Sequence, residues 1–161
     1  MAPENATTAD ESLDVITDAL LTASRLLVGI SAHSIAQVDD TITIPQFRTL
    51  VILSNRGPVN LATLAGLLGV QPSATGRMVD RLVAAELSDR LPHPTSRREL
   101  VAALTKRGRE VVRRVTAHRR AEIARIVEKM PPAERHGLVR ALTAFTAAGG
   151  EPDVHLDIDD L

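Results

Sequence analysis

The stretch LATLAGLLGVQPSATGRMVDRLVAAEL, residues 61–87, decides the fold. Asn60 is a good N-cap for a short helix over LATLAGLL, and Gly69 stands where a left-handed residue is expected to end that helix. Pro72 is well placed at the first position of the next helix, which is predicted to run to about Ala85. Two short helices joined by so tight a turn form a helix-turn-helix.

The second of these helices has an apolar side and a polar side. At about 100° per residue, the apolar side comprises Ala74, Thr75, Met78, Val79, Leu82 and Val83. The polar side comprises Ser73, Gly76, Arg77, Asp80 and Ala84, with Arg81 beside them. Only Arg77 and Asp80 project far from its first two turns, and a helix start this bare suits insertion between two sugar-phosphate walls.

The residues that follow predict a hairpin. LSDRL (87–91) and RELVAAL (98–104) are candidate strands, and the prolines and hydroxyl residues of PHPTSR (92–97) indicate a turn between them. A helix-turn-helix followed by a two-stranded hairpin is a winged helix.

Further helices are predicted on both sides of this unit. The helix expected over residues 11–37 has an apolar stripe made of Leu13, Ile16, Leu20, Leu27 and Ile30. Another begins at Pro45 and ends at Gly57, and Thr105 caps a long helix over 106–130, after which a last helix extends to about 148. The terminal helices carry more apolar surface than a winged helix needs, which predicts a homodimer. The alternative is a helical bundle closed within one chain.

Charge is unevenly distributed along the 161 residues, although the net charge is only -1. Residues 1–47 hold one basic and seven acidic side chains, residues 48–125 fifteen and six, and residues 126–161 three and seven. A basic middle between acidic ends indicates a local surface for a polyanion, with solvated helix faces as the alternative.

Several classes of function are disfavoured. The chain has no cysteine, which excludes disulfides and thiolate chemistry, and its five histidines show no pair at metal-ligand spacing. We find no phosphate loop, nucleophile elbow or carboxylate cluster, so neither an enzyme nor a cofactor is expected. No secretory signal and no apolar run of about 18 residues is present, which predicts a cytoplasmic protein that does not span a membrane.

The order of these elements resembles that of the MarR family of bacterial transcription regulators, over roughly residues 13–145. The resemblance rests on TIPQFRTLVIL (43–53), the helix-turn-helix stretch, PHPTSRRELVAALTKRGREVV (92–112) and MPPAER (130–135). It implies a mainly α fold with a helical dimerisation region at 1–37, a winged helix-turn-helix at 45–104, linker and dimerisation helices at 105–148, and an acidic, mobile tail at 149–161. It also implies a repressor that binds palindromic duplex DNA as a homodimer.

The residues expected to contact DNA lie on the helix-turn-helix and the wing. They are Asn60, Gln71, Ser73, Thr75, Gly76, Arg77, Arg81, Ser96, Arg97 and Arg98. Arg77 is the expected base contact, most naturally to guanine, and Arg97 is favoured for the minor groove with Arg98 facing phosphate. Thr75 is equally well interpreted as a buried hydroxyl. Capping alone is the favoured role of Asn60, and Arg81 is expected to reach a phosphate or Asp80.

The chain departs from the family pattern at three positions. Ser96 replaces the acidic residue that usually precedes the wing arginines, His93 stands where an acidic residue is usual, and Glu86 takes the place of a glycine. If the backbone at Glu86 is left-handed, the side chain costs about 1 kcal/mol.

The family also implies release from DNA by a small, often aromatic or phenolic, anion. The polar contacts expected for this effector are His33, Gln37, Arg48 and His118, although a histidine beside an apolar stripe is more often a structural residue. The rival to a DNA-binding regulator is a winged-helix adaptor that binds proteins, a reading that Ser96 favours.

Overall fold

The computed structural model describes residues 12–151, which form helices around one small antiparallel sheet. In chain order the elements are α1 (Leu13–Ala36), α2 (Ile44–Arg56), β1 (Val59–Asn60), α3 (Leu61–Leu68), α4 (Pro72–Ala84), β2 (Ser88–His93), β3 (Ser96–Leu104), α5 (Lys106–Lys129), α6 (Pro132–Arg135) and α7 (Leu138–Ala148). The expected mobile tail lies, from residue 152 onward, outside the described residues.

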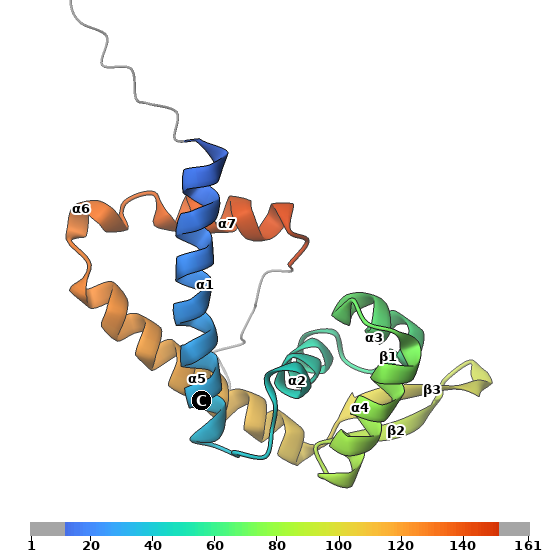
Figure 1. Ribbon diagram of the computed structural model, residues 1–161. Coiled ribbons are helices and arrows are strands. Elements are labelled where there is room, and N and C mark those ends of the chain that lie inside the picture. The colour runs from blue at the N-terminus through green and yellow to red at the C-terminus, as the bar shows by residue number, and fades with distance from the viewer. Residues whose placement is uncertain (1–11, 152–161) are drawn as a thin grey trace, which may run out of the picture.

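The helices and the sheet divide the molecule into two ends (Figure 1). α2, α3 and α4 gather with the sheet at one end, whereas α1, α6 and α7 lie at the other, and α5 connects the two. This arrangement confirms the predicted class, a mainly α winged helix-turn-helix with additional helices at both ends of the chain.

The sheet has three strands in the order β1-β3-β2, one more than the predicted two-stranded wing. The additional strand pairs Val59 with Ala102 and Asn60 with Val101. It forms because Gly57, with φ of 76°, and Pro58 end α2 and leave the next two residues extended beside β3. Its two residues are too few to produce an alternating pattern in the sequence.

The β2–β3 hairpin is longer than predicted. Strand pairing continues to His93 and Ser96, so the turn contains only Pro94 and Thr95 instead of all six residues of PHPTSR. The register shifts between Pro92 and His93, which accommodates a proline that cannot donate a strand hydrogen bond.

The predicted helix caps are confirmed at Asn60, Gly69 and Thr105. The Asn60 Oδ1 accepts from the backbone N–H of Thr63 at 2.7 Å, and the Thr105 Oγ1 accepts from that of Gly108 at 2.9 Å. Gly69 has φ of 66°, the left-handed conformation expected after α3. The sequence prediction missed a capping box in which Thr43 and Gln46 start α2 one residue before Pro45.

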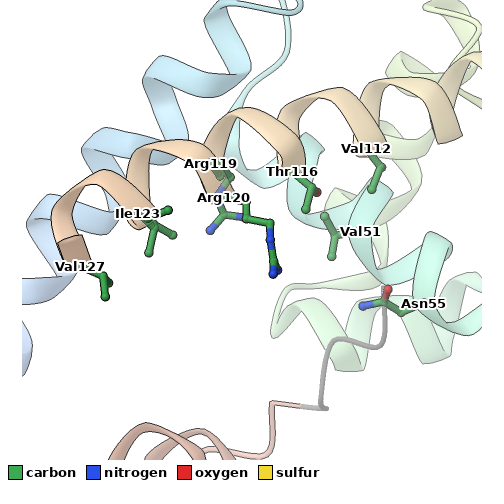
Figure 2. A pocket seen from close by; sticks show the side chains of 9 residues that line it. Val51, Asn55, Val112, Thr116, Arg119, Arg120, Ile123 and Val127 are labelled. Carbon is green, nitrogen blue, oxygen red and sulfur yellow. The ribbon is translucent and has the colours of Figure 1, made fainter. Parts of the chain in front are cut away.

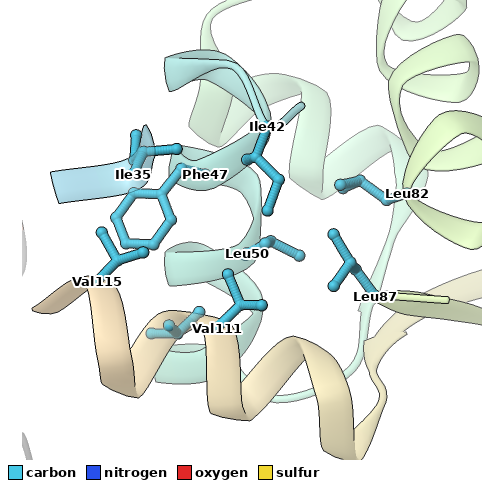
Figure 3. Close-up of a cluster of buried hydrophobic side chains, with 9 residues drawn as sticks. Ile35, Ile42, Phe47, Leu50, Leu82, Leu87, Val111 and Val115 are labelled. Carbon is cyan, nitrogen blue, oxygen red and sulfur yellow. The ribbon is translucent and has the colours of Figure 1, made fainter. Parts of the chain in front are cut away.

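The main core joins the two ends of the molecule. Figure 3 shows aliphatic side chains and one aromatic ring packed between the end of α1, α2, the residues after α4, and α5. Its buried members are Ile35, Ile42, Phe47, Leu50, Leu82, Leu87, Val111, Val112 and Val115. A second cluster, made of Leu53, Leu64, Val79 and Ala102, holds α3 and α4 against α2 and β3.

α5 begins in close contact with the residues that follow α4. A Cβ atom on Gly108 would lie 2.1 Å from the carbonyl oxygen of Leu87, so only glycine fits there. The Thr105 Oγ1 also donates to the carbonyl of Glu86 at 2.7 Å. Glu86 has φ of 60°, which confirms the left-handed backbone considered from its sequence position.

The terminal helices leave large apolar side chains exposed within one chain. Leu13 is 82% exposed, Val139 79% and Phe145 54%, and α7 has no buried residue. The last predicted helix is in fact two, α6 and α7, because Gly137 adopts a left-handed φ of 78° between them.

α1 is long and apolar enough, by length and composition alone, to cross a membrane. An 18-residue window within Leu13–Ala36 has a mean hydropathy of 1.5, and none of that window is buried. The prediction from the sequence counted only uninterrupted apolar runs, which the threonines and serines of this helix break. A single helix of this kind is weak evidence for a membrane span.

Candidate nucleic-acid interface

α4 carries the side chains on which the predicted DNA contact depends, and we call it the recognition helix. The predicted contacts that lie exposed on it or at its N-cap are Gln71, Ser73, Arg77 and Arg81. Thr75, Val79 and Leu82 are buried on the opposite side. The division into a polar and an apolar side that the sequence predicted is therefore present.

Thr75 is one predicted contact that the structure removes from the interface. Its residue surface is 0% exposed, and its Oγ1 donates to the carbonyl of Gln71 at 3.3 Å. Of the two interpretations from the sequence, a DNA contact or a buried hydroxyl, the structure supports the buried hydroxyl. A β-branched side chain fits there because the hydroxyl bonds to its own helix while the methyl group packs inward.

Gly76 faces a residue that sequence reasoning missed. Arg90, on β2, donates from Nη2 to the carbonyl of Gly76 at 3.1 Å, and the same atom lies 2.8 Å from Oδ1 of Asp80. A Cβ atom on Gly76 would lie 3.9 Å from this guanidinium. Asp80 therefore pairs with Arg90, whereas the sequence analysis considered Asp80 as a partner of Arg81. No periodicity within α4 signals a contact that comes from another element.

Asn60 lies half-buried at the start of α3, and its side-chain oxygen is already used by the cap. The predicted capping role is therefore filled. The side-chain amide nitrogen forms no hydrogen bond within residues 12–151, which leaves it able to donate outward.

The wing presents two arginines at the beginning of β3. Arg97 and Arg98 are exposed, and neither forms an ion pair within residues 12–151. Ser96 is half-buried and stands opposite His93 in the strand register. The His93 Nδ1 accepts from the backbone N–H of Thr95 at 3.2 Å, so this histidine closes the hairpin turn.

The four residues expected to hold an effector are not gathered in one place. His33 lines a shallow cavity between α1 and α5 with Arg25 and Glu122, whereas Gln37 follows the last residue of α1. Arg48, on α2, pairs with Glu151 at 3.1 Å, and His118 is exposed on α5.

A larger cavity of about 460 Å³ lies between α2 and α5, and we call it the α2–α5 pocket (Figure 2). Its lining residues are Val51, Asn55, Val112, Thr116, Arg119, Arg120, Ile123, Ala124 and Val127. The Nε of Arg119 is buried without a hydrogen-bond partner among the described residues, and burial lowers the pKa of this guanidinium.

Sequence reasoning missed Arg119 and Arg120, although a signal was present. Val112, Thr116, Arg119, Ile123 and Val127 follow one another at spacings of four, three, four and four. Arg119 is thus a charge on an otherwise largely apolar stripe. Within residues 12–151 no group of three or more His, Asp or Glu side chains is placed to hold a metal ion.

These features together define a class of protein. A helix-turn-helix whose second helix exposes a polar side, beside a hairpin with two exposed arginines, is characteristic of winged helix-turn-helix proteins. The same class is found among proteins of related sequence and structure.

A family model of the MarR family matches residues 42–100. The crystal structure of RV1404 from Mycobacterium tuberculosis is similar at 87% identity with a TM-score of 0.83, covering 91% of this chain and 99% of that chain. The HTH-type transcriptional repressor Rv2887 of the same species is 32% identical over 101 residues, which are 63% of this chain and 73% of the relative. The chain belongs to the MarR family of transcription regulators.

A more distant structure has the same fold. FabT from Streptococcus pneumoniae, solved in complex with DNA, has a TM-score of 0.73 at 18% identity, covering 87% of this chain and 99% of that chain. The resemblance stated from the sequence is confirmed, and the family is one of regulators rather than enzymes.

Proposed function

We propose that this chain is a cytoplasmic repressor that binds palindromic duplex DNA as a homodimer and is released by a small anion. The observation that carries the proposal is the recognition helix, whose polar side is exposed while its other side is buried in the core. A relative named as a repressor and a neighbour solved with DNA agree with it.

The recognition helix fits the major groove, which is wide enough for an α-helix. Ser73, in the first turn, donates to a phosphate, since free N–H groups and the helix dipole favour an anion there. Arg77 reads a base edge, and a bidentate contact to guanine contributes about 1–3 kcal/mol of discrimination. Gln71 and Arg81 lie beside this contact and face the sugar-phosphate backbone of the DNA.

The wing adds a second, electrostatic contact. Arg97 enters a narrow minor groove, where the negative potential attracts a guanidinium group, and Arg98 faces a phosphate. Ser96, half-buried before them, can form a hydrogen bond but not the ion pair that an acidic residue would form. Asn60 caps α3 with its oxygen and offers its amide nitrogen to the backbone of the DNA.

A homodimer accounts for the apolar surface of α1 and α7. The exposed large apolar side chains on these two helices are Leu13, Val15, Ile16, Leu21, Leu26, Leu27, Val28, Val139, Leu142 and Phe145. Pairing with a second copy removes this surface from water and presents two recognition helices to half-sites about one helical turn apart. A palindromic operator follows from the symmetry of the dimer.

The α2–α5 pocket is the place we propose for the effector. Its volume of about 460 Å³ lies in the range of small-molecule sites. Arg119 and Arg120 supply positive charge, and Arg48 lines an adjoining cavity. His33, Gln37 and His118 stay candidates only if the second copy brings them to the same site.

The test is an anisotropy titration against DNA from upstream of the chain's own gene and against random duplex of equal length, at several salt concentrations. We expect tighter binding to the upstream DNA and a steep decrease of log affinity with log salt. Arg77→Ala should reduce the ratio of the two affinities about 5- to 150-fold.

Arg98→Ala is the matched control, because it removes the same charge from a phosphate contact. It should weaken both DNAs alike and lower the salt slope by about 1. No affinity for the upstream DNA, or no preference for it over the random duplex, would overturn the proposal in favour of the adaptor. An Arg77→Ala variant with unchanged preference would overturn the role of Arg77. Sodium benzoate, as a small aromatic anion, should weaken DNA binding by the parent and not by an Arg119→Gln/Arg120→Gln variant.

A further inference from the structure

The α2–α5 pocket has positive charge without a matching acidic group. Arg119 and Arg120 line it, the Nε of Arg119 is buried without a hydrogen-bond partner among the described residues, and none of the nine lining residues is acidic. Arg119 is half-buried, and a half-buried guanidinium that lacks an anion carries part of the desolvation cost of a buried charge, which an acidic occupant would offset. The same helix also gives the pocket an apolar surface, with Val112, Ile123 and Val127, and Val51 of α2 faces it (Figure 2).

The described part of the chain ends beside this pocket. Glu151, the last described residue, accepts from Nη2 of Arg48 at 3.1 Å, which ties the end of the chain to α2. The cavity lined by Arg48, Gly150 and Glu151 shares Val51 and Asn55 with the α2–α5 pocket. The residues after 151 therefore start at the edge of the pocket.

The chemistry of the next ten residues complements the pocket. The segment 152–161, PDVHLDIDDL, contains four aspartates and four large apolar residues, and no lysine or arginine. Its aspartates match Arg119 and Arg120, and its valine, leucines and isoleucine match the apolar surface of Val112, Ile123 and Val127 beside them. Ten residues extend to about 33 Å, so reaching a pocket that begins at the preceding residue needs only part of that length.

We propose that segment 152–161 binds in the α2–α5 pocket of its own chain, with its aspartates at Arg119 and Arg120. An attached segment acts at an effective concentration of about millimolar order, so it competes with any free anion for the same arginines. The segment thereby sets the effector concentration at which the pocket responds. This binding does not depend on whether the chain binds DNA.

Paramagnetic NMR on the full-length protein tests the proposal. The chain has no cysteine, so Leu161→Cys gives a single site for a nitroxide, and isotope labelling of isoleucine, leucine and valine methyl groups provides the probes. We expect the methyl signals of Ile123 and Val127 to lose most of their intensity relative to the reduced label. Leu91 and Leu100 on the wing should keep theirs.

Two sets of substitutions separate binding from accidental proximity. Asp157→Asn, Asp159→Asn and Asp160→Asn together change only the segment and leave the pocket intact, and Arg119→Gln with Arg120→Gln changes only the pocket. Both should restore the signals of Ile123 and Val127, as should 1 M salt, at which the screening length is about 3 Å.

Three outcomes would overturn the proposal. They are undiminished signals in the parent, signal loss that survives the asparagine substitutions, and equal loss in a sample where nitroxide and isotope are on different copies. The last would assign the pocket to the segment of a second copy. No DNA is present in any sample, so these outcomes are separate from those of the DNA-binding test.

Discussion

The guanidinium of Arg90 lies 2.8 Å from the carboxylate of Asp80 and joins the first strand of the wing to the recognition helix. The same nitrogen donates to the carbonyl of Gly76, one residue before Arg77. Asp80 is an acidic group on the side of the helix proposed to face phosphates, where it would repel DNA if it were unpaired. Arg90 therefore neutralises Asp80 and fixes the turn of helix that projects Arg77.

Replacing Arg90 is expected to weaken sequence discrimination more than overall affinity. Arg90→Met keeps much of the length of the side chain but removes two contacts. These are the ion pair with Asp80 and the hydrogen bond to the carbonyl of Gly76. Since hydrogen bonds to charged groups contribute about 1.5–3 kcal/mol and exposure reduces that value, we expect a loss of about 1–2 kcal/mol in binding to upstream DNA. Anisotropy on upstream and random DNA measures both affinities.

Asp80→Asn completes a double-mutant cycle with Arg90→Met. If the pair acts as described, the double variant should lose less than the sum of the single variants, with a coupling energy of about 1 kcal/mol. Effects that simply add would show that Arg90 acts on DNA without Asp80.

Gly108→Ala is expected to destabilise the chain because of one backbone contact. Its Cβ would stand 2.1 Å from the carbonyl oxygen of Leu87, so α5 must shift away from the residues after α4. Overpacking of this kind costs about 1–3 kcal/mol, which urea unfolding followed by circular dichroism would measure. Gly66→Ala is the matched control, since a Cβ there meets nothing within 4 Å. That variant should be unchanged or more stable by up to about 1 kcal/mol, and equal losses in both would refute the contact as the cause.

Glu86→Gly is expected to stabilise the chain. The left-handed φ of 60° at Glu86 costs a non-glycine residue about 1 kcal/mol, and the ion pair lost with Arg107 is exposed and worth little. A gain of up to about 1 kcal/mol corresponds to a Tm increase of about 2–4 °C. The protein concentration must be fixed, because a dimer's Tm depends on it.

Ala85→Gly tests whether the gain comes from the left-handed backbone. Ala85 has φ of -83°, a conformation that alanine adopts freely, so glycine there should lower the Tm. A rise in both variants would point to some other effect of glycine after the recognition helix.

The sequence predicted the features that depend on neighbouring residues. The helical spacing in 72–85 separated the polar from the apolar side of the recognition helix, and capping chemistry located the starts of α3 and α5 at Asn60 and Thr105. Glu86 stands where the family pattern has a glycine, and the left-handed backbone that such a glycine indicates is present.

The features that were missed depend on contacts between distant elements. Arg90 is one of several arginines in a basic stretch, and only the packing of β2 on α4 brings it to Asp80. β1 exists because β3 lies beside it. The predicted effector residues, such as His118 on α5, do not line the α2–α5 pocket. Arg119 and Arg120 of the same helix line it instead.

The apolar side of α7 gives the sharpest test of the proposed homodimer. Val139, Leu142 and Phe145 lie three residues apart on one side of the helix and are 79%, 46% and 54% exposed. Phe145→Asp places a charge in the surface that a second copy would cover. Since a buried aromatic anchor contributes 2 kcal/mol or more, the dimer dissociation constant should rise at least about 30-fold. Sedimentation velocity over a range of concentrations measures this change.

Ala144→Asp is the matched control for that substitution. Ala144 is exposed on the opposite side of α7, so the same charge there should leave the dimer intact. Because two recognition helices are needed for a palindrome, Phe145→Asp should also weaken binding to the upstream DNA at concentrations where the chain is monomeric, whereas Ala144→Asp should bind as the parent does. A Phe145→Asp chain that stays dimeric, or a parent that sediments as a monomer, would mean that α7 is covered by something other than a second copy.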